Sequence, residues 1–201
     1  MSVQQAYSQT LALIDSANSA DPNQAIDNGN SRPKEQLYAE RMTDMLLRFK
    51  PDADELQHLA ARAQHIERWK TPRSNYPMDK QGYMQWRTGL YRYHADRVGE
   101  LMLQSGYDTE SIERVKKAVG KKGIKVNPDS QLIEDIASLV FIEHYMFDFA
   151  QQHPEYDEAK WIGIIQKTWR KMSEQGQAFA LSGQLKLPEP LVPVIQKALG
   201  V

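Results

Sequence analysis

The chain has 201 residues, of which 41% are hydrophobic and 25% are charged, and its net charge is −1. This length and composition are typical of one soluble globular domain, and the near-zero charge excludes a general attraction for nucleic acid or for an anionic membrane. The absence of cysteine excludes disulfides, thiolate metal sites and cysteine nucleophiles, and no apolar run approaches the length of a membrane-spanning helix.

Apolar residues recur at helical spacing along most of the chain, and no stretch alternates with the period of a strand. The pattern therefore predicts an all-α fold with about seven to nine helices in one domain. We place helices over about residues 3–20, 34–49, 51–69, 79–105, 108–119, 128–151, 157–172 and 188–199. The helix over 128–151 is the most apolar of these, which predicts a central place in the core.

Three connecting segments have a distinctive composition. Residues 28–33 are predicted to form a loop, because Asn and Gly tolerate positive φ and Pro33 suits the first turn of the next helix. Residues 71–79 contain two prolines, which remove backbone donors, so we expect an ordered but irregular loop there. The sequence Gly120-Lys-Lys-Gly123 is predicted to be a turn with a solvated basic rim.

The end of the helix over 51–69 and the loop after it combine ionisable and aromatic residues in a short span. The residues are His65, Arg68, Trp69, Arg73 and Tyr76. Binding groups are often mounted where a helix gives way to irregular backbone. The alternative is a helix cap with a partly buried histidine.

Two acidic residues interrupt the apolar helix over 128–151. Asp135 lies between Ile133 and Ile136, where an unpaired carboxylate would be costly to bury. It therefore requires an arginine, a histidine or a metal as its partner. The alternative to a ligand role is a structural salt bridge to Arg41 or Arg68. Glu143 follows Phe141 and Ile142, so the same alternatives apply to it, whereas Glu134 is expected to be exposed.

The span from His94 through Gly106 to Asp135 resembles the second half of HD-domain metal phosphohydrolases. In that family a histidine opens a helix that ends in glycine, a short helix follows, and a metal-binding aspartate lies on the next long helix. Asp135 falls at this aspartate, His94 falls at an additional histidine of some members, and His65 occupies the place of the paired His-Asp. The resemblance implies an HD-like helical domain with His65, His94 and Asp135 as catalytic and metal-binding residues.

Two positions depart from that pattern. Tyr38 stands where the first histidine ligand would be, and Ile66 replaces the aspartate of the name-giving pair. Because that aspartate ties two metals together, the resemblance implies at most one divalent ion, held by three ligands and water. Without a metal, we expect the Tyr38 hydroxyl to bond His65 or Asp135 beside an anion-binding pocket.

More specifically, the chain is similar to an uncharacterised family known as a domain of unknown function, number 4202. The resemblance covers residues 31–172, with residues 1–27 as an N-terminal helix and residues 173–201 as a helical extension. Its motifs are Gln64-His-Ile-Glu-Arg-Trp69, Pro72-Arg-Ser-Asn-Tyr-Pro-Met78, Gly82-Tyr83, Trp86-Arg87, His94-Ala95, Glu134-Asp135 and Leu139-Val-Phe-Ile-Glu143.

These features support two main hypotheses. The first is an HD-like hydrolase, or a binding protein, for a small phosphorylated ligand or nucleotide, in which arginines neutralise the anion and aromatic side chains stack. The second is a degenerate, non-catalytic HD fold that binds a nucleotide or an RNA end. The ligand-binding candidates are Tyr38, Arg41, Arg68, Trp69, Arg73, Tyr76, Tyr83, Trp86, Arg87 and Glu143.

For Trp86, packing in the core is an equally good interpretation. A third hypothesis, a purely structural partner protein, would be favoured if the cluster were dispersed in space. The chain has neither the basic nor the apolar region of a secretory signal, so we expect a cytoplasmic protein without a membrane partner and without an extended nucleic-acid footprint.

Overall fold

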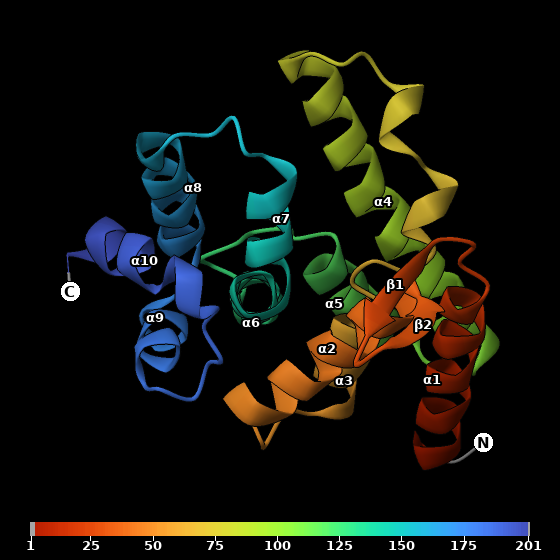
Figure 1. The fold of residues 1–201 in the computed structure, drawn as a ribbon. Helices are drawn as coiled ribbons and strands as arrows, with labels where there is room; N and C mark the ends of the chain where they lie inside the picture. The colour runs from red at the N-terminus through yellow and green to blue at the C-terminus, as the bar shows by residue number, and fades with distance from the viewer. Residues whose placement is uncertain (1–2, 201) are drawn as a thin grey trace. The chain divides into compact units, whose positions relative to one another are not determined.

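A computed structural model describes residues 3–200 of the chain, which divides into two compact units, Met1–Ile133 and Glu134–Val201 (Figure 1). The predicted all-α class is confirmed, because helices dominate both units and the only strands among residues 3–200 form one two-stranded hairpin. Within the same residues, no helix has the length and apolar character needed to cross a membrane. The prediction of a single domain stays a prediction.

The first unit contains the hairpin and most of the long helices. Its elements are α1 (Val3–Ser19), β1 (Gln24–Asp27), β2 (Asn30–Pro33), α2 (Lys34–Phe49), α3 (Glu55–Arg62), α4 (Lys80–Gln104) and α5 (Thr109–Val119). Two 3₁₀ turns, η1 (Arg68–Lys70) and η2 (Arg73–Asn75), lie between α3 and α4, and α6 (Pro128–Val140) begins in this unit.

The hairpin replaces the loop predicted over residues 28–33. Asp27 pairs with Asn30 in the antiparallel register, so Asn28 and Gly29 form a two-residue turn. Both turn residues have positive φ, +48° and +80°. Asn-Gly is the preferred sequence for such a turn, and it was the signal for a hairpin, although four-residue strands are too short to show clear alternation.

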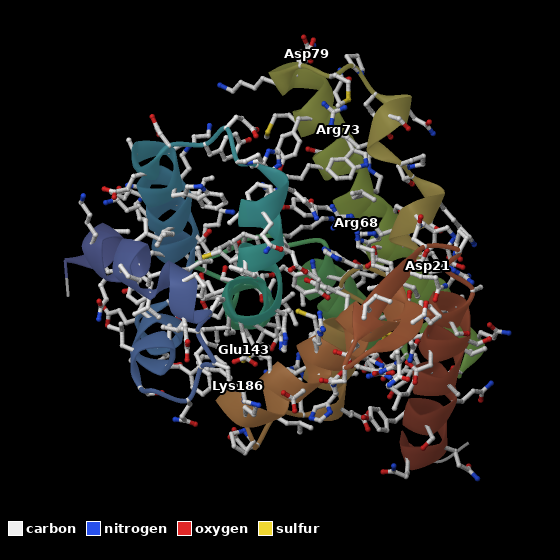
Figure 2. The ribbon with its side chains drawn as sticks, viewed as in Figure 1. Asp21, Arg68, Arg73, Asp79, Glu143 and Lys186 are labelled. Atoms are coloured by element: carbon white, nitrogen blue, oxygen red, sulfur yellow. The ribbon has the colours of Figure 1, made fainter. Side chains whose placement is uncertain are left out.

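The start of α2 is held by a residue that precedes the hairpin. Pro33 occupies the N-cap of α2 and gives no side-chain cap. Instead, Oδ2 of Asp21 accepts a hydrogen bond from the backbone N–H of Glu35 at 3.0 Å (Asp21 is labelled in Figure 2). This bond satisfies one of the free donors at the helix start and fixes Glu35.

The helix predicted over 51–69 ends earlier, at Arg62. Turns follow, and Glu67 adopts a left-handed conformation with φ of +52°. The backbone N–H of Glu67 donates to Oδ1 of Asn18, and its buried carboxylate accepts hydrogen bonds from Tyr93 and Arg97. These bonds to α1 and α4 outweigh the helical tendency of the sequence around His65.

The irregular segment over residues 63–79, expected only for 71–79, runs along α4 (Figure 1). The indole N–H of Trp86 donates to the backbone oxygen of Thr71 at 2.8 Å, which ties the segment to the helix. A Cβ atom at Gly82, in the first turn of α4, would lie only 2.1 Å from the backbone oxygen of Pro77. Glycine at position 82 therefore permits this close approach.

The second unit completes α6 and adds four further helices. After α6 comes a π-helical turn (Phe141–Tyr145), then α7 (Met146–Gln152), α8 (Glu158–Lys171), α9 (Glu174–Leu181), the 3₁₀ turn η4 (Glu189–Leu191) and α10 (Val192–Leu199). Residues 3–200 thus form ten α-helices rather than seven to nine. The π turn divides the predicted helix over 128–151, and the short helix α9 was not predicted as a separate element.

We predict that Gly82→Ala lowers the free energy of unfolding by about 1–3 kcal/mol, because the new methyl group would overlap backbone atoms that cannot move without breaking the segment from α4. Chemical denaturation measures this change. Gly163→Ala in α8 is the matched control, since a Cβ atom there meets no atom within 4 Å. The control should be neutral or slightly stabilising, and equal behaviour of the two variants would contradict the proposed close contact.

Candidate functional site

The two predicted site histidines lie side by side in the first unit. The ring centroids of His65 and His94 are 5.8 Å apart. His94, in the middle of α4, is only 2% exposed, and within the described residues neither of its ring nitrogens has a hydrogen-bond partner. The nearby backbone of Gln64 favours protonation of the ring slightly, but without the geometry of a full hydrogen bond. Such unsatisfied buried groups are unusual and call for a functional explanation.

His65 is sandwiched between two side chains. The ring of Tyr38 stacks on it, with centroids 4.0 Å apart and planes at 11°. Nη1 of Arg68 lies 3.3 Å from both ring nitrogens of His65. An atom equally close to both nitrogens must lie over the ring face, because in the ring plane it would collide with the carbon between them. Tyr38 and Arg68 therefore cover opposite faces of His65.

The stack continues through Arg68. Its guanidinium carbon lies 5.1 Å from the ring centroid of Trp86, which is a favourable cation–π distance. The order is thus Tyr38, His65, Arg68, Trp86, contributed by α2, the 63–79 segment and α4. Within residues 3–200, Arg68 forms no ion pair, in contrast to Arg62 and Arg97. Its charge is held in place by stacking, and among residues 3–200 no carboxylate forms an ion pair with it, although it acts on Glu35 at longer range.

Glu35 is a member of the site that the sequence reasoning missed. Oε2 of Glu35 lies 3.6 Å from Nδ1 of His65, and the residue is buried. Burial raises the pKa of Glu35 to about 7, although the charges of Arg68 and Lys34 act in the opposite direction. The sequence could have identified Glu35 by its position three residues before Tyr38, because this spacing places both side chains on one face of α2. Glu35, His65, Arg68 and His94 are called the histidine cluster below.

The histidine cluster is electropositive. Burial lowers the pKa of His65 well below its ordinary value, and the charges of Arg68, Lys121 and Lys34 lower it further. Burial also lowers the pKa of His94, helped by His65, Arg68 and Lys121. Both imidazoles are therefore neutral near pH 7, and the positive charge of the cluster comes from the arginine and the lysines.

The other predicted residues of the 63–79 segment mainly fix its shape. Arg73 donates from Nη1 to the backbone oxygen of Tyr76 at 3.0 Å and from Nη2 to that of Asp79 at 3.3 Å (Figure 2). The hydroxyl of Tyr76 packs near Gly89 of α4, and Trp69 lies half-buried in η1. These bonds shape the loop, and within residues 3–200 no hydrogen bond or ion pair joins Arg73 to the histidine cluster.

Three predicted residues lie elsewhere in the first unit. Tyr83 is half exposed, and its ring centroid lies 5.9 Å from that of Trp86. Arg87 hydrogen-bonds the hydroxyl of Tyr91 through Nε and lies against the ring of the same tyrosine. Arg41 forms an ion pair with Asp27 of β1 at 2.9 Å. Tyr83 thus lies beside the Trp86 end of the stack, with the two rings tilted by 50°, whereas Arg41 ties α2 to the hairpin.

The predicted acids of the second unit have structural partners there. Asp135 accepts two hydrogen bonds from Ser173, from its backbone N–H at 2.7 Å and from its hydroxyl at 2.6 Å, and so holds the start of α9. Glu143 accepts from the backbone N–H of Lys186 at 2.9 Å (Figure 2). Glu134 is buried, contrary to the expected exposure, and lies 3.8 Å from Lys171. A buried carboxylate is stabilised by such donors.

The metal implied by the HD-like resemblance has no ready set of ligands among residues 3–200. Within residues 3–200, no group of three or more histidine, aspartate or glutamate side chains is arranged to hold a metal ion. Tyr38 stacks on His65 with its ring, Ile66 is fully buried, and Asp135 accepts hydrogen bonds from Ser173. Binding of a single divalent ion, and the convergence of Asp135 with the two histidines, stay predictions.

A pocket in the first unit lies away from the histidine cluster. It is lined by Leu56, Gln57, Ala60, Arg114, Val115, Ala118, Asp129, Leu132 and Ile133. Its polar groups bond one another, since Gln57 and Arg114 both donate to Asp129 at 2.8 Å and 2.7 Å. The pocket therefore offers few polar groups to a ligand, and the chemistry of the unit is concentrated at the histidine cluster.

The raised pKa of Glu35 predicts a pH-dependent stability. A folded-state pKa of about 7, against an ordinary value of 4.5, favours the unfolded state by on the order of 3 kcal/mol once the pH exceeds both values. The folded state is therefore not penalised below pH 4.5, the ordinary pKa, and it loses stability as the pH rises from there toward the folded-state pKa of about 7. Glu35→Gln should therefore gain free energy of unfolding relative to the parent between about pH 5 and pH 8.

Chemical denaturation at the two pH values measures this gain, and Glu110→Gln on the exposed surface of α5 is the control. A stability difference between Glu35→Gln and the parent that stays constant with pH would show that Glu35 ionises normally.

Comparison with models of protein families shows which family the chain belongs to. A family model described as "Domain of unknown function (DUF4202)" matches residues 8–195, which includes nearly all of both units. Comparison with curated proteins and with solved structures found no match. The match covers well over half of the sequence, so the chain belongs to the DUF4202 family.

Proposed function

We propose that the first unit binds a small phosphorylated ligand at the histidine cluster. The observation that carries this proposal is the Arg68 guanidinium, which is fixed by stacking between His65 and Trp86 and forms no ion pair within residues 3–200. A cation that is held in place without a carboxylate is available to an anion. The planar guanidinium matches two oxygens of a phosphate group at once.

The two histidines supply the remaining polar contacts. A neutral imidazole carries one N–H donor, so His65 and His94 can each donate one hydrogen bond to a phosphate oxygen. The ring nitrogens of His94 have no partner within residues 3–200, and His65 keeps 23% of its side chain exposed. A ligand that reaches His65 from solvent would also meet Arg68, which lies against one face of the His65 ring.

Trp86 and Tyr83 favour a nucleotide among phosphorylated ligands. Both are near Arg68, and Tyr83 is 41% exposed, so an aromatic base could stack there while its phosphate reaches the guanidinium. The net charge of −1 argues against a long nucleic-acid footprint. In the non-catalytic alternative, a degenerate fold would use the same contacts for a nucleotide or an RNA end without turnover.

We predict that Arg68→Gln weakens binding of inorganic phosphate by about tenfold to a hundredfold, because a hydrogen bond to a charged group contributes about 1.5–3 kcal/mol. Calorimetric titration measures the dissociation constant. Arg92→Gln is the matched control, since Arg92 is exposed on α4 and the substitution removes the same charge. Equal losses in both variants would point to a diffuse charge effect, and no loss in either would overturn the proposed site.

A second candidate, hydrolysis of a phosphate ester at the same place, is favoured by the contact of Glu35 with His65. In this reaction water attacks phosphorus, the P–O bond to the alcohol breaks, the proton of the water passes to the His65–Glu35 pair, and the alcohol leaves with a proton from solvent or from that pair. General acid–base groups of this kind typically contribute a factor of about 10²–10⁴ to the rate.

We therefore predict that the parent releases phosphate from AMP and that Glu35→Gln loses most of this release while it still binds inorganic phosphate. A colorimetric phosphate assay follows the release, with Glu110→Gln as the control. Binding of phosphate without any release by the parent would favour the non-catalytic alternative.

A further inference from the structure

The outer half of α4, together with the segment that runs along it, extends beyond the other helices of the first unit (Figure 1). Among residues 69–89, only Gly82 is buried, whereas the inner half of α4 is buried at intervals over residues 90–102. Hydrogen bonds nevertheless fix the shape of the outer half, because Asp79 caps the helix at the N–H of Gly82 and the segment is bonded to Trp86. This part of the unit is therefore ordered but adds little to the hydrophobic core.

The segment covers one side of α4 and leaves the opposite side uncovered. Gly82, Trp86 and Gly89 all contact the segment, so their side of the helix faces it. Successive residues of an α-helix are turned by about 100°. Lys80 and Met84 therefore lie on the side that faces away from the segment, and both are exposed.

This uncovered side continues the side of α4 that is buried deeper in the unit. Met84, Tyr91 and Val98 follow one another at steps of seven residues, and Met102 lies about five full turns after Met84. Val98 and Met102 are fully buried, whereas Met84 is 52% exposed. The apolar pattern of α4 thus runs past the part of the helix that the other helices of the first unit cover.

Two cationic residues flank the exposed apolar side chains. Lys80, Tyr83, Met84 and Arg87 have the spacing i, i+3, i+4 and i+7, so they share one face, which is called the outer face of α4 below. In the described part of the chain neither Lys80 nor Arg87 forms an ion pair, and Arg87 bonds the hydroxyl of Tyr91 instead.

The charge around the outer face differs from that of the whole chain. Residues 70–92 contain five lysines or arginines and one acidic residue, Asp79, although the net charge of the chain is −1. The Asp79 carboxylate accepts a hydrogen bond at the start of α4. The outer face is thus an apolar strip in a basic environment, which is complementary to an acidic partner.

We infer that the outer face of α4 docks an acidic amphipathic helix of a partner protein. A partner helix with Glu at i and i+7 and apolar residues at i+3 and i+4 would set its carboxylates against Lys80 and Arg87. Its apolar side chains would then cover Met84 and Tyr83, as in helix pairs where flanking charges border an apolar seam. Methionine suits such a contact because its flexible side chain adapts to the partner.

Two other kinds of partner fit the outer face less well. A lipid surface would have to accommodate the exposed carboxylate of Asp79, which lies at the far end of the projection (Figure 2). A nucleic-acid strand binds by stacking on exposed aromatic rings, whereas the most exposed apolar side chain of the outer face belongs to Met84.

The experiment uses two labelled helical peptides that differ only in the charged positions. Both carry Leu at i+3 and i+4, and positions i and i+7 are Glu in one peptide and Lys in the other. Fluorescence anisotropy should show that the full chain binds the Glu peptide at least tenfold more tightly. Met84→Ser should weaken this binding by about tenfold, and Lys80→Gln by about twofold to fivefold.

Leu103→Ser is the matched control for the apolar contact, because Leu103 is 68% exposed near the other end of α4. Lys125→Gln is the control for charge, because Lys125 is exposed in the loop after α5. Both controls should bind the Glu peptide like the parent, and circular dichroism verifies that every variant is folded.

Several results would overturn the inference. They are no binding of the Glu peptide at about 1 mM, equal affinity for the two peptides, or parent-like binding by Met84→Ser. Binding of phosphatidylserine vesicles or of an oligothymidylate that Met84→Ser abolishes, without binding of the Glu peptide, would assign the outer face to a different kind of partner.

The inference is independent of the proposed phosphate site, and the same variants separate the two. Met84→Ser and Lys80→Gln should bind inorganic phosphate like the parent, because neither residue belongs to the histidine cluster. Loss of the Glu peptide alone in these variants therefore supports a docking face that is distinct from the phosphate site, whereas a matching loss of phosphate binding would contradict it.

Discussion

The geometry of the histidine cluster depends on the buried carboxylate of Glu67. Burial alone would raise the pKa of Glu67, but hydrogen bonds from Lys70 and Tyr93 and the charge of Arg97 outweigh it and hold the pKa below its ordinary value. The carboxylate is therefore ionised and joins η1 to α4, while the backbone of Glu67 is bonded to Asn18 of α1. This anchor lets a residue other than glycine keep a positive φ, at a cost of about 1 kcal/mol or more.

The turn at Glu67 directs the side chains of the neighbouring residues to different places. Ile66 enters the core, whereas His65 and Arg68 stack on each other. A continued helix through 69 would also have brought residues 65 and 68 near each other, but it would not have laid the 63–79 segment along α4, where Trp86 receives Arg68. The site is therefore built from two helices, α2 and α4, and a segment whose path is fixed by one buried anion, and its polar groups are pre-organised at the expense of stability.

The electrostatics of the histidine cluster support the proposed binding of an anion rather than a cation. Burial and the charges of Arg68 and Lys121 both disfavour a further positive charge at His65 and His94. An anion between these groups would relieve that repulsion, because opposite charges attract strongly where water is excluded. Glu35 keeps a proton up to about neutral pH for the complementary reason, since burial disfavours its negative charge.

The sequence by itself determined the helical class and most helix positions, and it singled out His65, Arg68 and His94, because apolar periodicity and local motifs are short-range properties. It did not reveal the place of Glu35 beside His65 or the partner of Asp135, because these depend on residues far apart in the chain. Asp135 illustrates the difference: its neighbours show that it needs a partner, but only the packing of α9 shows that this partner includes Ser173. Tertiary structure decided these pairings because a buried charge is stabilised by whichever donors the fold brings to it.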